Sequence, residues 1–194
     1  MKKPYYLTTP IYYVNDKPHI GHAYTTLACD VLARFKRLDG FDVTFLTGTD
    51  EHGQKVEKAA ETAAISPQAF TDQVSQNFRD LTVKMNFSND DFIRTTEERH
   101  KTACQEIWGI LYERGHITLG KYEGWYSVRD ETFFTETELV DGKAPTGAPV
   151  EWVEEESYFF RLSAFEQPLL DLYENQPDFI LPKGRRNEVI SFVK

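Results

Sequence analysis

Two histidines, His19 and His22, stand three residues apart in the segment NDKPHIGHAYTT, with Gly21 between them. An imidazole nitrogen can bind a metal ion, or it can donate a hydrogen bond to a phosphate oxygen. A single histidine near a helix start is more often exposed or hydrogen-bonded in the core. Two histidines in this arrangement make that reading weaker, so metal ligation and phosphate binding are the main alternatives.

A second pair of candidate groups, Asp50 and His52, follows in the segment LTGTDEHGQK. With His19 and His22 they offer nitrogen and oxygen donors that suit zinc or another divalent ion, as in a metal-dependent hydrolase. An aspartate in front of a helix is also a common N-cap. The hydrolase alternative requires both pairs to meet at one edge of a sheet.

Phosphate binding agrees better with the surroundings of the two histidines. Gly21 has no side chain, so a flat or anionic group can approach the backbone closely. The helix expected to begin there directs its free N–H groups and dipole at the same place. A carboxylate beside phosphates is repulsive, so a functional Asp50 should face a cation or an amino group. This predicts a nucleotide site whose second substrate carries a positive amine.

The elements that must position these residues begin with a strand that ends near Thr9. A helix follows between Gly21 and Gly40, because apolar residues recur there at helical spacing. A second strand covers Val43 to Leu46. Strand, helix and strand in this order form the βαβ unit of a parallel sheet.

The next elements continue this alternation. Ser66 is expected to cap a helix that starts at Pro67 and runs to about Met85. The segment DDFIRTT reads as a third strand, and Thr95 and Glu98 have the spacing of a capping box for the following helix. We therefore expect the first half of an open, doubly wound, Rossmann-like α/β sheet that binds a nucleotide.

The sequence changes character after His116, where β-branched and aromatic residues with turn signals predict antiparallel hairpins. Between Arg129 and Ser157 there are nine acidic residues against two basic ones. The whole chain carries a net charge of −9. A broad nucleic-acid surface on this chain is therefore not expected. The predicted division is a catalytic half-domain at 1–115, a mixed α+β connective insertion at 116–184 and the start of a return helix at 185–194.

Composition indicates an ordinary globular protein, with 40% hydrophobic and 27% charged residues among 194. The first residues lack a signal-peptide pattern, and no apolar run is long enough to span a membrane. Cys29 and Cys104 lie in separate helix-like segments, which fits two free thiols in a reducing compartment. A cytoplasmic location without membrane association is expected.

Several segments, in this order, resemble the N-terminal portion of methionyl-tRNA synthetases of the bacterial type, which are class I aminoacyl-tRNA synthetases. They read HIGH, TGTDEHG, GWYSVRDETFFTETEL, SYFFRLSAF and GRRNEVISFV, and they span almost the whole chain. The resemblance implies ATP-dependent activation of methionine to methionyl-adenylate, followed by transfer to tRNA(Met). It also implies that Mg²⁺ accompanies ATP.

The resemblance also implies roles for individual residues. His19 and His22 would contact the ATP phosphates and stabilise the transition state, and Gly21 would let adenine lie against the backbone. Asp50 would hold the α-amino group of methionine. The positions that match the methionine pocket are Pro10, Ile11 and Tyr13.

The chain departs from the family pattern in two ways. Many relatives carry zinc in the insertion, but the matching positions here are Ser127, Asp130, Ala144 and Gly147. These residues cannot complete a tetrahedral zinc site, so no structural zinc is expected and aromatic packing should hold the insertion (Trp125, Tyr126, Phe133 and Phe134). The family's K-M-S-K-S signature and anticodon-binding domain are also missing. We therefore expect a fragment with half an active site, inactive or nearly so alone, whose contacts to tRNA(Met) lie mainly in the missing part.

Three alternatives remain open at this stage. A smaller H-x-G-H nucleotidyltransferase would share the histidine chemistry, but it would lack the long acidic insertion. A metal-dependent hydrolase would use His19, His22, Asp50 and His52. A non-catalytic binding role is the third, because half of the site is missing.

Overall fold

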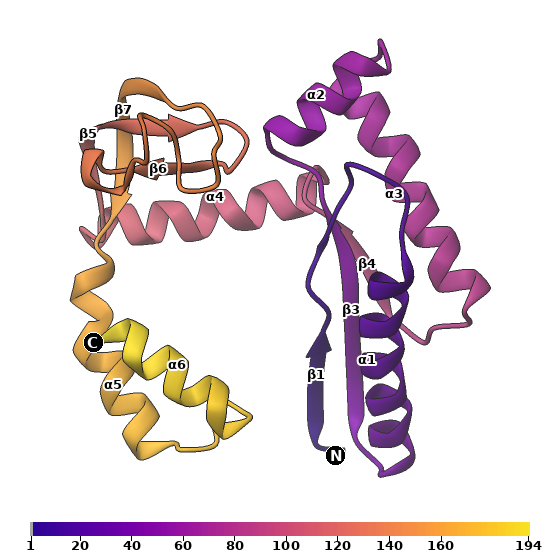
Figure 1. The fold of residues 1–194 in the computed structure, drawn as a ribbon. Helices are drawn as coiled ribbons and strands as arrows, with labels where there is room; N and C mark the ends of the chain where they lie inside the picture. Colours follow the sequence, from indigo (N-terminus) through magenta and orange to yellow (C-terminus); the bar gives the residue numbers. More distant parts are fainter. Residues whose placement is uncertain (1) are drawn as a thin grey trace. The chain divides into compact units, whose positions relative to one another are not determined.

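A computed structural model describes residues 2–194 of the chain. It divides into two compact units, Met1–Gln105 and Glu106–Lys194 (Figure 1). Over residues 2–194, no helix combines the length and the apolar character that crossing a membrane requires.

The first unit is built around one long central strand, β3 (Asp42–Asp50). Strands β1 (Pro4–Thr8) and β2 (Tyr12–Tyr13) follow one another in parallel along one edge of it, and β4 (Asp91–Arg94) lies parallel along the other. Pro10, which has no N–H to donate, lies in the gap between β1 and β2. The sheet is therefore fully parallel, as expected from the alternating pattern.

Helices provide the crossover connections between these strands (Figure 1). Helix α1 (Ile20–Leu38) leads from β2 to β3, and α2 (Gln54–Thr62) and α3 (Pro67–Lys84) lead from β3 to β4. The Ser66 side chain accepts a hydrogen bond from the Ala69 N–H at 3.2 Å, which confirms the predicted cap of α3. The α/β class and its βαβ unit are thus confirmed.

Helix α1 buries a different face from the one its apolar spacing indicates. Thr26, Asp30 and Ala33 are buried. Val31 and Phe35, by contrast, are 60% and 57% exposed. The buried aspartate is tolerated because it accepts hydrogen bonds from Ser88 and forms an ion pair with Arg34.

The predicted capping box at Thr95 and Glu98 is wrong. Helix α4 (Glu98–Glu113) does begin at Glu98, but the carbonyl of Glu97 accepts its first backbone hydrogen bonds. The Thr95 hydroxyl accepts a hydrogen bond from the Glu51 N–H at 2.9 Å instead. The threonine therefore joins β4 to the end of β3 and does not cap the helix.

The second unit contains an antiparallel sheet in the order β6–β5–β7. Its strands are β5 (Ile117–Ser127), β6 (Thr132–Phe134) and β7 (Glu151–Phe160). Tyr126 and Phe133 face each other with ring centroids 4.8 Å apart, which confirms the expected hairpin and its aromatic packing. Helices α5 (Glu166–Asn175) and α6 (Lys183–Val193) complete the unit, with short 3-10 turns η1 (Glu136–Glu138) and η2 (Leu162–Phe165).

Candidate functional site

The carboxyl ends of β2 and β3 bring two predicted site residues together. Tyr13 and Asp50 are register partners at the end of the two strands. The Tyr13 hydroxyl passes over Gly53, where an added Cβ would lie 2.3 Å from the phenolic oxygen. Gly53 also has φ +118°, which disfavours any other residue. This edge, beyond the carboxyl ends of parallel strands, is where open α/β sheets bind ligands.

His19 and His22 together cap the N-terminus of α1. The Gly21 N–H donates to His19 Nδ1 at 3.1 Å, and the His19 N–H donates to His22 Nδ1 at 3.0 Å. Because both Nδ1 atoms accept backbone hydrogen bonds, the neutral imidazoles carry their hydrogens on Nε2. Each histidine thus keeps one N–H donor for a ligand.

The two imidazole rings are held in place by stacking and aromatic contacts. Their centroids are 3.8 Å apart, with an interplanar angle of 23°. Tyr12 and Phe78 flank His22 at centroid distances of 4.7 and 5.2 Å. A Cβ at position 21 would lie 2.9 Å from His19 Cε1, so Gly21 is needed for the His19 ring to fold over the helix start. The site therefore presents ordered donors before any ligand arrives.

Burial lowers the pKa of His22, and the neighbouring His19 lowers it further. The unfolded chain therefore binds more protons than the folded chain at pH values between the lowered pKa and the ordinary value of about 6.5. This contribution to stability is present above about pH 6.5 and is lost as the pH falls through the folded pKa. Protonated His22 also cannot accept the His19 N–H at Nδ1.

We expect thermal stability to decrease between about pH 7 and pH 5, with part of the slope due to His22. His22→Asn should remove that part, because asparagine can still accept the His19 N–H but does not titrate. Unfolding temperatures over this pH range, together with an NMR titration of the His22 ring, would measure it. An identical slope in the variant, or a His22 pKa above its ordinary value, would contradict the assignment.

Asp50 is a partly buried carboxylate at the end of β3. Within residues 2–194 its side chain has no hydrogen bond or ion pair. It is also not an N-cap, since Gly53 holds that position for α2. An uncompensated carboxylate at a sheet edge suits a ligand ammonium group, in agreement with the charge argument from the sequence.

The two other residues predicted to line the methionine pocket, Pro10 and Ile11, lie in the gap between β1 and β2. Both are exposed, and Ile11 is 42% exposed. The neighbouring Thr9 hydroxyl contacts the Thr47 hydroxyl at 2.7 Å, which ties this gap to the middle of β3. The structure thus joins Tyr13 directly to Asp50, whereas Pro10 and Ile11 make no such contact.

Sequence reasoning missed Glu51 and Arg94. The Glu51 side chain is fully buried and forms a two-pronged ion pair with Arg94, at 2.7 Å to Nε and 2.8 Å to Nη2. Arg94 also pairs with Asp72 of α3 at 2.6 Å. The sequence offered two signals for this ion pair: the arginine at the end of the short strand in DFIRTT, and the glutamate in TGTDEHG. Only the fold shows that the two residues meet.

The hydrolase alternative is not supported by the arrangement of its donors. Among residues 2–194, no three histidine, cysteine, aspartate or glutamate side chains form a cluster that could hold a metal ion. His19 and His22 direct Nδ1 to the backbone. His52 Nδ1 lies 3.0 Å from the hydroxyl of Thr95, the residue after β4, and does not contact the other histidines.

The positions that match the zinc ligands of relatives do not fit a metal. The hydroxyls of Ser127 and Thr146 both donate to Asp130 Oδ2, at 2.9 and 2.6 Å. These hydrogen bonds, from Thr146 above all, lower the pKa of Asp130. Ala144 is buried and, like Gly147, has no side-chain donor. The Gly147 N–H donates to the Ala144 carbonyl at 2.8 Å, so hydrogen bonds close this loop.

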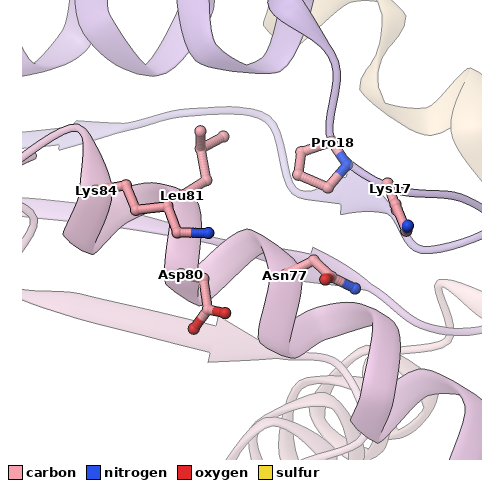
Figure 2. Close-up of a pocket in the computed structure, with 6 residues that line it drawn as sticks. All are labelled: Lys17, Pro18, Asn77, Asp80, Leu81 and Lys84. Carbon is pink, nitrogen blue, oxygen red and sulfur yellow. The ribbon is translucent and has the colours of Figure 1, made fainter.

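A hollow of about 210 Å³ lies beside the loop that leads into His19 (Figure 2). It is lined by Lys17, Pro18, Asn77, Asp80, Leu81 and Lys84. Its charges are mixed, and none of the predicted site residues lines it. The candidate site is therefore the sheet edge with its capped helix, and not this hollow.

Comparison with known proteins identifies the family of the chain. Residues 5–151 match the family of class I tRNA synthetases of the methionine type. The methionine–tRNA ligase of Rickettsia conorii is 67% identical over the whole chain, and that of Mesorhizobium japonicum is 59% identical. In both cases the chain spans 38% of the relative.

Solved structures lead to the same group. Mycobacterium tuberculosis methionyl-tRNA synthetase in complex with methionyl-adenylate is 54% identical, with a TM-score of 0.90. That match covers 98% of this chain and 38% of the other. The smaller nucleotidyltransferase and the hydrolase are thereby ruled out as families. The chain belongs to the class I tRNA synthetases of the methionine type.

Proposed function

We propose that this chain supplies the first half of a methionine-activating site. Methionine and ATP react there to give methionyl-adenylate and pyrophosphate, and the methionyl group then passes to tRNA(Met). The main support is that one unit contains both parts of such a site. His19 and His22 cap the start of α1 and each keeps a free Nε2–H, and the Asp50 carboxylate has no partner among the described residues. A relative crystallised with methionyl-adenylate is consistent with this reaction.

In the proposed reaction a carboxylate oxygen of methionine attacks the α-phosphorus of ATP, and the bond to pyrophosphate breaks. His19 and His22 donate from Nε2 to phosphate oxygens and stabilise the charge that develops on them. Fixed donors are effective because phosphoryl-type transfer depends on positioning and electrostatics. ATP enters as its Mg²⁺ complex.

The other proposed site residues bind methionine and the adenine of ATP. Asp50 holds the ammonium group of methionine, and the exposed Gly21 leaves room for adenine beside the backbone. Pro10, Ile11 and Tyr13 contribute to the pocket for the methionine side chain. Shape alone distinguishes one apolar side chain from another by only about 10- to 200-fold per methylene.

The proposed organisation keeps a catalytic half-domain at 1–115, a connective insertion at 116–184 and a return helix from 185. The tRNA contacts lie mainly outside this chain, since the insertion is acidic. Cys29 and Cys104 are both free thiols, which fits a cytoplasmic location. Aromatic packing and the hydrogen bonds around Asp130 hold the insertion in place of zinc, and one equivalent of zinc in the purified chain would contradict this.

Amino-acid-dependent exchange of pyrophosphate into ATP tests the proposal. We expect the full-length gene product to catalyse exchange with methionine and with no other of the twenty amino acids. The 194-residue chain alone should give little or none. Full activity in the short chain would contradict the half-site proposal, and absence of exchange from the full-length product would contradict methionine activation itself.

A further inference from the structure

Glu51 is the most tightly held acidic residue of the candidate site. Its side chain is fully buried, and both carboxylate oxygens are bound by Arg94. The Thr49 hydroxyl donates to Oε1 at 2.7 Å, and the Thr96 hydroxyl donates to Oε2. A buried carboxylate of this kind is costly unless all its oxygens are satisfied, so the surrounding residues must stay in place.

These bonds hold the main chain on both sides of Asp50. The Glu51 N–H donates to the Thr95 hydroxyl at 2.9 Å, and the Thr95 N–H donates to the Thr49 carbonyl at 3.3 Å. On the opposite edge, Tyr13 is the register partner of Asp50. Asp50 can therefore shift only if the end of β4 shifts with it.

Two acidic side chains already bind Arg94, so Arg94 is not a counter-charge for Asp50. Arg94 binds Glu51 and also Asp72 of α3, at 2.6 Å. One guanidinium thus serves two carboxylates, while the Asp50 carboxylate has no partner among the described residues. A ligand ammonium group therefore meets its counter-charge at Asp50.

We propose that Arg94, acting through Glu51, is a positioning residue for methionine. It fixes the place of Asp50 at the end of β3 and binds the carboxylates of Glu51 and Asp72. Neither Arg94 nor Glu51 touches the substrate. This inference rests on the proposed function, because it assumes that Asp50 holds the ammonium group of methionine.

The test compares Arg94→Lys and Glu51→Gln in the full-length gene product. Lysine retains the charge but cannot make the two-pronged contact, and glutamine retains the shape but not the charge. A displacement of about 1 Å at Asp50 can cost about 10²-fold, so we expect kcat/KM for methionine to fall by roughly 10²-fold, mainly through a higher KM for methionine. The KM for ATP should stay unchanged, because the histidine cap belongs to α1.

Arg99→Lys is the matched control. Arg99 also forms ion pairs, with Asp91 and Glu97, but its side chain is 50% exposed. We expect it to leave both KM values unchanged. Thr95→Val is a second test variant that leaves Glu51, Arg94 and Asp72 in place, so it serves if the charge variants do not fold. It removes the acceptor of the Glu51 N–H and the hydroxyl that His52 Nδ1 contacts. It should raise the KM for methionine several-fold.

The outcomes separate this inference from the proposed function. If the parent protein shows no methionine-dependent exchange, both are overturned. If the parent is active but folded variants keep its KM for methionine, the positioning role alone is overturned. Equal losses for methionine and ATP, in proportion to the folded fraction, would also overturn it, because they would indicate a purely structural ion pair. A selective loss for methionine supports it.

Discussion

Gly48→Ala is expected to lower the free energy of unfolding of the chain by about 3 kcal/mol. Position 48 lies in the middle of β3, and a Cβ there would lie 2.0 Å from the Ile93 carbonyl oxygen. It would also lie 2.6 Å from the Ile93 Cγ2 atom. Because the first of these is a backbone atom, the methyl group fits only if β3 and β4 move apart.

Chemical denaturation of the 194-residue chain would measure this loss, with Gly109→Ala as the control. A Cβ at position 109, inside α4, meets no atom within 4 Å. Alanine there should stabilise the helix by roughly 0.5–1 kcal/mol. The two glycine-to-alanine changes are thus expected to have opposite signs. Equal stability of Gly48→Ala and the parent would contradict the close approach of the two strands.

The histidine cap permits an experiment that separates folding from catalysis. Asparagine can accept a backbone N–H in place of Nδ1, but it has no donor at the position of Nε2. His19→Asn and His22→Asn should therefore fold normally. Each should slow methionine-dependent exchange by the full-length gene product by about 10²–10³-fold, the usual effect of removing one donor to a developing charge.

The double variant should lose less than the product of the two single losses, since the imidazoles act together. His100→Asn is the control, because His100 contacts Cys104 on α4 and has no place in the proposed site. A rate within a few fold of the parent in His22→Asn would exclude phosphate contact by Nε2. A parallel fall in stability and rate would show that the residue acts only as a cap.

The sequence was most informative where local rules determine the structure. Ser66-Pro67 predicted a helix start, and apolar spacing predicted α1, because both signals depend on neighbouring residues alone. Strand β2 was missed because its two residues, Tyr12 and Tyr13, are a strand only through pairing with β3. Local rules cannot show such a pairing.

Contacts between residues far apart in the sequence explain the other differences between prediction and structure. The capping-box prediction failed because the Thr95 hydroxyl bonds to Glu51, 44 residues away in the chain. Glu51 and Arg94 were missed for the same reason, since 43 residues separate them. The histidines and Asp50 could be predicted as site residues because their residue types are informative even before their positions are known.

The burial of Glu51 against Arg94 also limits how this site can change over evolutionary time. Loss of Arg94 alone leaves the buried Glu51 carboxylate without its partner, which costs about 3–5 kcal/mol, whereas Arg94 without Glu51 still pairs with Asp72. Replacement of both by well-packed apolar residues can be neutral for stability. Arg94 is therefore hard to replace while Glu51 remains, and any descendant that loses the pair must find another way to fix Asp50.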